Sequence, residues 1–152
     1  MENLSAIIIG SDHAAYPLKE RIKQELVRRG LRVEDVGTHD NASCDYPEFG
    51  RAVARRVASG EFERGILLCG TGIGMSMVAN RFPGIRAALC AEPLSASLSR
   101  RHNDANVLVM GGRMIGEAMA LEIVAVWLET AFEGDRHQRR IAMFDRVPPE
   151  AG

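Results

Sequence analysis

The segment Gly65–Asn80, GILLCGTGIGMSMVAN, decides the fold of this chain. It begins with a short apolar run, Ile66–Leu68, which is typical of a strand buried on both faces. Cys69 and the glycine-rich turn Gly70–Gly74 follow, and residues Met75–Asn80 have a helical pattern. A strand, a glycine-rich turn and a helix in this order direct backbone N–H groups toward the end of the strand, where an anion can bind.

Strands and helices alternate on both sides of this segment. The remaining strands are predicted at Ala6–Ile9, Leu31–Val36, Arg86–Cys90 and Val107–Met110, and the remaining helices at Leu18–Arg29, Pro47–Ser59, Pro93–Arg101 and Ile115–Phe132. The second strand is more polar and is expected near an edge of the sheet. Residues 134–147 are expected to form a short helix. The pattern predicts an α/β fold, a three-layer α/β/α doubly wound (Rossmann-like) arrangement with a five-stranded parallel sheet.

Length and composition favour a single cytoplasmic domain. The 152 residues are expected to form one domain, with residues 148–152 frayed. With 19 basic and 20 acidic side chains, the net charge of -1 gives no support for a nucleic-acid partner. We identify neither a signal peptide nor an apolar run of the roughly 20 residues that span a membrane. Three cysteines without paired spacing fit a reduced, cytoplasmic protein.

Polar side chains follow several of the predicted strands. Asp12 and His13 follow the first strand, Cys69 and the glycine turn follow the third, and Glu92 follows the fourth. Ligands of doubly wound sheets bind at the carboxyl ends of the strands. The sequence therefore predicts a polar site at that edge.

The glycine turn does not match the common nucleotide-binding patterns. Met75 occupies the position of the third glycine in G-x-G-x-x-G, and the turn lacks the Lys-Ser/Thr pair of a P-loop. A tight turn without a ligand is one interpretation. Three alternating glycines, Gly70, Gly72 and Gly74, beside a thiol instead favour close approach of a ligand.

Other candidate residues have two interpretations from sequence alone. Cys69 is either a small buried side chain or a thiolate stabilised by the following helix N-terminus. His102 either interacts with a helix C-terminus or acts with its neighbour Asn103 in a site. Arg136 and Arg140 are either solvated or clamp a phosphate. The histidines and cysteines lack the spacing of a zinc site.

Five motifs resemble type B ribose-5-phosphate isomerases, a family that includes galactose-6-phosphate isomerase subunits and allose-6-phosphate isomerases. The motifs are Gly10-Ser11-Asp12-His13, Asp45-Tyr46-Pro47, Cys69–Gly74, Ser99–Asp104 and Gly134–Arg140. They occur in the family's order, and the resemblance extends from about Leu4 to Val147.

The resemblance implies aldose–ketose isomerisation through a cis-enediolate, without a metal or an organic cofactor. Cys69 matches the base that takes the C2 proton and returns it at C1. The backbone of Gly70, Gly72 and Gly74 would stabilise the enediolate oxygen. Thr71 and His102 match residues that open the furanose ring.

The remaining matched residues bind the sugar phosphate. Asp12, Tyr46 and Asn103 match residues that hold sugar hydroxyls, and the phosphate-binding set matches His13, Arg113, Arg136 and Arg140. The family is dimeric, sometimes a dimer of dimers, with sites shared across the interface. Residues 134–147 are therefore expected to pack on a partner subunit, where Arg136 and Arg140 reach its site.

Two positions depart from common family patterns. Met75 holds the place where some members have a glutamate, so the chain resembles the subtype with a cysteine base. Asp135 replaces a common glycine and puts a negative charge beside the arginines. The leading hypothesis is interconversion of ribose 5-phosphate and ribulose 5-phosphate. Alternatives are a six-carbon substrate, allose 6-phosphate or galactose 6-phosphate, and a non-catalytic nucleotide-binding module.

Overall fold

The sheet has five parallel strands in the order β2-β1-β3-β5-β4. The computed structural model describes residues 4–146. The strands are β1 Ala6–Ser11, β2 Arg32–Asp35, β3 Gly65–Cys69, β4 Ala87–Leu89 and β5 Val107–Gly111. The predicted parallel sheet is confirmed, and the polar strand β2 lies at an edge, as expected.

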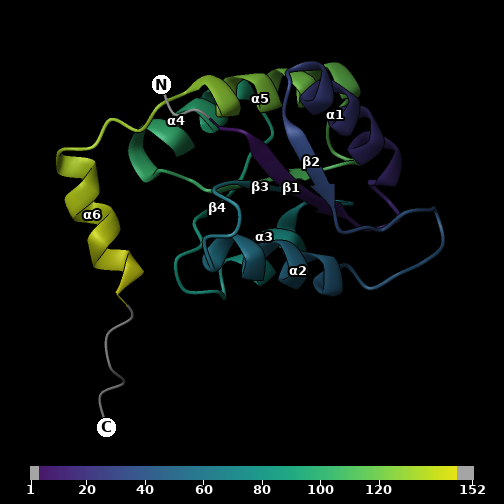
Figure 1. The fold of residues 1–152 in the computed structure, drawn as a ribbon, viewed down its shortest axis with the longest axis horizontal. Coiled ribbons are helices and arrows are strands. Elements are labelled where there is room, and N and C mark those ends of the chain that lie inside the picture. Colours follow the sequence, from purple (N-terminus) through teal and green to yellow (C-terminus); the bar gives the residue numbers. More distant parts are fainter. Residues whose placement is uncertain (1–3, 147–152) are drawn as a thin grey trace, which may run out of the picture.

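Helices cover both faces of the sheet. They are α1 Tyr16–Arg28, α2 Tyr46–Ala58, α3 Ile73–Ala79, α4 Pro93–Asn103, α5 Glu117–Glu129 and α6 Arg136–Asp145. In Figure 1, α1, α4 and α5 lie on one face, α2 and α3 lie on the other, and α6 lies to one side. This arrangement confirms the predicted three-layer fold.

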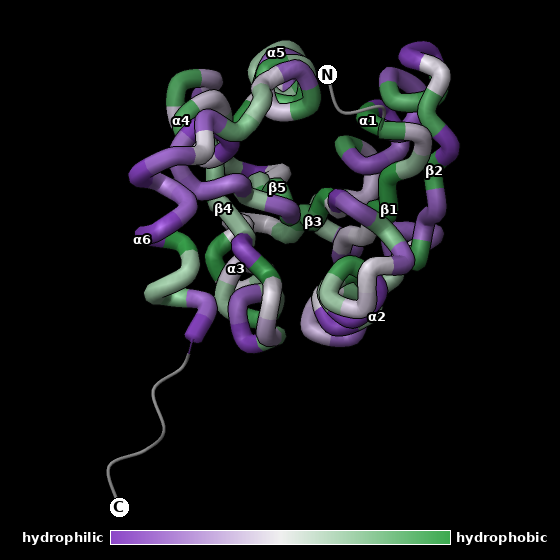
Figure 2. The backbone as a smooth tube through the Cα atoms, turned by 60° about the vertical axis from the view of Figure 1, so that its left-hand side comes forward, coloured by the Kyte–Doolittle hydropathy of each residue, from purple (hydrophilic) through white to green (hydrophobic). Residues whose placement is uncertain are grey.

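The central strands are buried on both faces because every position carries an apolar or small side chain. In β3, Ile66 and Leu68 pack in the core beneath α1, α4 and α5, which includes the fully buried Trp127. Leu67 and Cys69 face the opposite core, beneath α2 and α3. Figure 2 shows that β3 is hydrophobic, whereas the first turns of α6 are hydrophilic. Packing on both faces therefore holds the carboxyl end of β3, where Cys69 lies, in a fixed position.

The turn after β3 requires a glycine at position 72. Gly72 has a φ of 80°, and a Cβ placed on it would lie 2.5 Å from Leu89 Cδ1 and 3.0 Å from the backbone carbonyl carbon of Met110. The left-handed conformation and the close approach both exclude larger side chains. It precedes α3, which begins at Ile73, two residues earlier than predicted.

The last long helix is shorter than the predicted Ile115–Phe132. Helix α5 ends at Glu129, and the Thr130 carbonyl accepts a hydrogen bond from Arg100 Nε over 3.2 Å. The chain then returns along α4, where Glu133 N–H donates to the Arg101 carbonyl over 3.1 Å. The expected short helix in the tail is confirmed as α6, while residues 148–152 lie outside the described residues. Among the described helices, every one is too short or too polar to cross a membrane.

Candidate functional site

Nine candidate residues gather at the carboxyl ends of the strands. They are Asp12 and His13 after β1, Tyr46 at the start of α2, Cys69, Gly70, Thr71, Gly72 and Gly74 at the end of β3 and beyond it, and Arg113 after β5. We call this set the carboxyl-edge cluster. Strand register brings its parts together, because Ser11 pairs with Leu68 and Cys69 pairs with Gly111.

Cys69 lies beneath the glycine turn with its sulfur held by the backbone. The residue is 4% exposed, and the Gly72 N–H donates a hydrogen bond to Cys69 Sγ over 3.1 Å. An N–H donor at this position stabilises negative charge on sulfur. The geometry suits a thiolate that accepts a proton from a ligand above the turn.

The same turn presents unpaired backbone donors. Within residues 4–146, the N–H groups of Gly70 and Thr71 make no hydrogen bond. The Ile73 N–H instead donates to Thr71 Oγ1 over 3.2 Å. Backbone N–H groups without partners beside a thiol can bind an oxyanion, which is the role that the sequence predicts for this turn.

Tyr46 covers the far side of the turn. A Cβ placed on Gly74 would lie 2.5 Å from Tyr46 Cζ and from its hydroxyl oxygen. Tyr46 is 37% exposed, so the ring packs on the backbone while its edge remains accessible. Close packing of a phenol on this turn therefore requires glycine at position 74.

Asp12 and His13 are both oriented by backbone N–H groups. Asp12 Oδ1 accepts a hydrogen bond from the Ala15 N–H over 3.1 Å, while its Oδ2 has no partner within residues 4–146. His13 Nδ1 accepts from the Cys44 N–H over 3.2 Å. In a neutral imidazole this bond places the proton on Nε2, which becomes a donor for a ligand.

Arg113 brings a free positive charge to the carboxyl-edge cluster. Its N–H donates to the Gly70 carbonyl over 2.9 Å, and its guanidinium would lie 3.5 Å from a Cβ placed on Gly70. None of the ion pairs found within residues 4–146 involves its guanidinium. A guanidinium in this state can bind a phosphate.

The other four candidates lie at the amino ends of the strands, opposite the carboxyl-edge cluster. His102 and Asn103 end α4, and Arg136 and Arg140 belong to α6. Helix α4 begins after the carboxyl end of β4 and runs back, so its last turn reaches the start of β5. We call this set, with His137, the amino-edge cluster.

His137 joins α6 to the end of α4. Its ring stacks on that of His102 with centroids 4.4 Å apart and planes at 14°. Burial lowers the pKa of His137, and the nearby Arg136 and His102 lower it further, so the neutral ring is favoured. The stack joins the first turn of α6 to the last turn of α4.

One chain does not bring the two clusters together. Cys69 pairs with Gly111, the last residue of β5. Asn103 instead lies near Val107, the first residue of β5, because Arg86 donates to the Asn103 carbonyl and accepts from the Val107 N–H. Four residue steps along a strand span about 13 Å. His102 and Asn103 are therefore separated from Cys69 by roughly the length of the strand.

Comparisons with known proteins identify the family. The family described as "Ribose/Galactose Isomerase" matches residues 7–144. The chain belongs to this family. It is 49% identical over 138 residues to the ribose-5-phosphate isomerase B of Escherichia coli, covering 91% of this chain and 93% of that protein.

The chain is also similar to two further sugar-phosphate isomerases. A D-erythrulose-4-phosphate isomerase from Pectobacterium atrosepticum is 45% identical over 132 residues, covering 85% of this chain and 86% of that protein. The crystal structure of a ribose 5-phosphate isomerase from Thermotoga maritima has a TM-score of 0.92 and 51% identity, covering 96% of this chain and all of that one.

The structure gives a local role to two residues that bear on the sequence alternatives. Met75 is fully buried among apolar side chains, so it contributes no acid beside Cys69. The Glu92 carboxylate accepts hydrogen bonds from the Leu94 and Ser95 N–H groups over 2.6 and 2.8 Å and so caps α4. Hydrogen bonds from the Ser95 hydroxyl and N–H lower the pKa of Glu92. A carboxylate that caps its own helix is already hydrogen-bonded, which disfavours a role for Glu92 in the predicted polar site.

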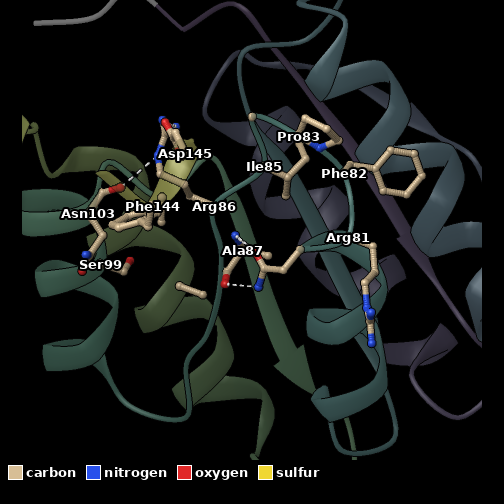
Figure 3. A pocket seen from close by; sticks show the side chains of 14 residues that line it. Arg81, Phe82, Pro83, Ile85, Arg86, Ala87, Ser99, Asn103, Phe144 and Asp145 are labelled. Atoms are coloured by element: carbon tan, nitrogen blue, oxygen red, sulfur yellow. Dashed lines mark hydrogen bonds and ion pairs between the residues drawn. The ribbon is translucent and has the colours of Figure 1, made fainter. Parts of the chain in front are cut away.

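A cavity of about 470 Å³ borders the amino-edge cluster (Figure 3). Phe82, Ile85 and Phe144 give it apolar walls, and Asn103 lies at one side. Arg86 lies between α4 and α6: its Nε donates to the Asn103 carbonyl over 3.0 Å, and its guanidinium contacts Asp145 over 3.1 Å. The cavity includes none of the carboxyl-edge cluster.

Two residues at this edge were missed by sequence reasoning. The sequence predicts Arg86 only as the start of a strand, and no local pattern distinguishes it. Glu133 lies four residues before His137, a spacing that places two side chains on one face of a helix, but here the chain between them is not yet helical. Their contact depends on the path between α5 and α6.

Proposed function

We propose that this chain is an aldose–ketose isomerase that interconverts ribose 5-phosphate and ribulose 5-phosphate. The observation that carries the proposal is the position of Cys69 Sγ under the Gly72 N–H, beside the unpaired N–H groups of the glycine turn. Enediolate chemistry requires a proton acceptor close to an oxyanion site, and this arrangement supports assigning both roles to the same short turn.

The reaction begins when the furanose ring opens. His102, assisted by Thr71, moves a proton from the C1 hydroxyl to the ring oxygen, which releases the open-chain aldehyde. Cys69, as a thiolate, then removes the C2 proton, and the electron pair moves through C1 onto the carbonyl oxygen. The Gly70 and Thr71 N–H groups stabilise that oxyanion.

The second half of the reaction returns the proton. A proton moves from the C2 hydroxyl to the C1 oxygen, and the Cys69 thiol then protonates C1, which leaves a ketone at C2. Asp12, Tyr46 and Asn103 hold the sugar hydroxyls. No atom is gained or lost in the overall change, and the thiolate is regenerated.

The site is completed by a second copy of the chain in a homodimer. The strand-length separation of Cys69 from His102 supports this proposal, since neither residue can reach the other's ligand alone. Each chain acts as one domain whose residues 134–147 serve the partner's site. We also propose that dimers pair into tetramers and that the enzyme is cytoplasmic.

The phosphate is held from both subunits. His13 Nε2–H and the Arg113 guanidinium approach from the carboxyl-edge cluster, and Arg136 and Arg140 approach from the partner subunit. Asp135 directly precedes Arg136, so its negative charge reduces the net positive charge at the start of α6.

The proposed chemistry applies to sugar phosphates with four, five or six carbon atoms. One relative is named for a four-carbon ketose phosphate, and the family resemblance includes six-carbon substrates. We propose the five-carbon sugar first, and comparison of kcat/KM for erythrulose 4-phosphate, ribose 5-phosphate and allose 6-phosphate tests that order. Thermal stabilisation by NAD or ATP, but by no sugar phosphate, would instead support a nucleotide-binding module.

The decisive experiment is proton NMR of ribose 5-phosphate with purified protein in D2O containing EDTA. Appearance of ribulose 5-phosphate with deuterium at C1 is the expected result, because the Cys69 thiol exchanges with solvent between the two steps. If ribose 5-phosphate is not converted and none of its C–H protons exchanges, interconversion of ribose 5-phosphate and ribulose 5-phosphate is excluded as the function.

A further inference from the structure

Three potential metal ligands converge at the amino edge, outside the glycine turn. His102 comes from the end of α4, Glu133 from the connection after α5, and His137 from the first turn of α6. One ligand atom of each lies within 4.8 Å of the other two. Residues from the end of α4 and from the segment that leads into α6 thus form one compact group of two imidazoles and a carboxylate.

One of these ligands is buried with an unused ring nitrogen. His137 is 6% exposed, and its Nε2 has no hydrogen-bond partner within residues 4–146. The nearest acceptor, Glu133 Oε2, lies 3.5 Å away, within ion-pair distance but without hydrogen-bond geometry. A buried, unsatisfied nitrogen is costly, and a bound ion would satisfy it.

The carboxylate is already oriented for such a role. Arg101 Nε donates to Glu133 Oε1 over 2.5 Å, and the Glu133 N–H donates to the Arg101 carbonyl over 3.1 Å. These two bonds fix the residue at both ends and leave Oε2 facing His137. Support of a ligand by a neighbouring hydrogen bond is usual in metal sites.

We propose that His102, Glu133 and His137 bind a divalent transition-metal ion such as Zn²⁺ and that the bound ion inhibits the enzyme. Two imidazole nitrogens and one carboxylate oxygen are a ligand set that zinc accepts, with a further position left for water. The stacked rings cannot both direct a lone pair at one ion, so His102 must turn about its Cβ–Cγ bond. It can do so because it is half-buried and makes no hydrogen bond to any described residue.

The inhibitory effect rests on the proposed function, in which His102 moves protons during ring opening. A metal bound to the His102 ring nitrogen occupies the lone pair that this step needs. The ion would also fix α6 to α4 in one arrangement. Inhibition is therefore expected to be reversible on addition of EDTA.

The test uses Co²⁺ as a spectroscopic probe on the EDTA-treated and dialysed full chain. One Co²⁺ per chain should bind, with visible d–d bands typical of nitrogen and oxygen ligands. Glu133→Gln should weaken Co²⁺ and Zn²⁺ binding at least tenfold while leaving activity without metal unchanged. Arg101→Gln is the matched control, because it removes the same ion pair and retains all three ligands, so it should weaken binding less than Glu133→Gln does.

Three outcomes would overturn the proposal. An intense charge-transfer band from cobalt–thiolate bonds would assign the ion to a cysteine. Equal affinity in wild type and Glu133→Gln would exclude the carboxylate as a ligand. Metal binding that depends on Glu133 but leaves ribose 5-phosphate isomerisation unchanged would overturn the inhibition.

Failure of the isomerase proposal itself is distinguishable, since the cobalt spectrum needs no substrate. A chain that binds Co²⁺ through Glu133 but converts no sugar phosphate would retain the metal site and lose the proposed function.

Discussion

The fully buried ammonium of Lys19 lies 2.6 Å from Asp35 Oδ1 and donates to the Thr38 carbonyl. Lys19 belongs to α1 and Asp35 ends β2, so this contact ties a helix to the loop that follows β2. That loop continues to Cys44, whose N–H orients His13, and to Tyr46, which covers the glycine turn. A buried ion pair remote from the thiol therefore helps to place two candidate ligands.

Lys19→Met should lower the free energy of unfolding by about 3 kcal/mol, because it leaves a partly buried carboxylate with one cation fewer. Urea unfolding measures the change. Lys23→Met is the control: Lys23 contacts the same carboxylate over 2.7 Å but is 28% exposed, so its loss should cost less than about 1 kcal/mol. Equal effects of the two substitutions would contradict the role given to burial.

Asp35 should also make stability depend on pH. Burial raises its pKa, but hydrogen bonds from Lys19, Lys23 and the Gly37 N–H outweigh burial and lower the pKa overall. A lowered carboxyl pKa contributes stability above the unfolded value of about 3.9, and that stability is lost as the pH falls through the folded value. Melting temperatures from pH 7 downward should fall less steeply in Asp35→Asn than in wild type; parallel curves would contradict this assignment.

Cys69→Ala should reduce kcat for ribose 5-phosphate by about 10²- to 10⁴-fold, the usual contribution of a general base. Cys90→Ala is a suitable control, since Cys90 is also buried and its surroundings raise the thiol pKa to about 11. Initial rates for both variants, with circular dichroism to confirm folding, provide the measurement. Full activity in Cys69→Ala would exclude it as the base.

Mixing two inactive variants tests whether sites are shared. Cys69→Ala and His102→Gln, unfolded and refolded together, should regain about a quarter of wild-type activity, because half of the dimers are mixed and each has one complete site of two. Cys69→Ala mixed with Asp12→Asn should regain none, since both changes lie at the carboxyl edge. Recovery in neither mixture would show that each chain builds its own site.

Asp135→Gly should stabilise the chain by about 1 kcal/mol, because Asp135 has a φ of 51° and a ψ of -123°, a region that glycine occupies without strain. The same change removes a negative charge beside Arg136 and should lower KM for sugar phosphates. Thermal melts and initial rates separate the two effects. Asp135→Asn removes only the charge, so it should share the change in KM and not the stabilisation.

The sheet could be predicted from sequence because its signals are local. Apolar runs such as Ile66–Leu68 and the glycines between elements indicate strands and their ends without any tertiary information. The start of α3 was placed too late because the left-handed conformation of Gly72 and its contact with Leu89 depend on packing. The length of α5 likewise depends on Arg100, which lies on another helix.

Part of the separation between the two clusters can be predicted from the sequence. A helix that follows a parallel strand runs back toward the amino edge, so the place of His102 at the end of α4 already separates it from Cys69. The contacts of His137 could not be inferred in this way. They follow from the path of residues 130–135, which has no periodic pattern to reveal where α6 packs.

The placement of Cys69 and His102 at opposite ends of the strands has a consequence for kinetics. If each site needs both edges, a newly synthesised chain has no turnover until it meets another. Specific activity would then fall on dilution below the dimer dissociation constant, and the rate would approach second order in protein. The enzyme would acquire activity by association and lose it by dissociation, with no change in the fold of either chain.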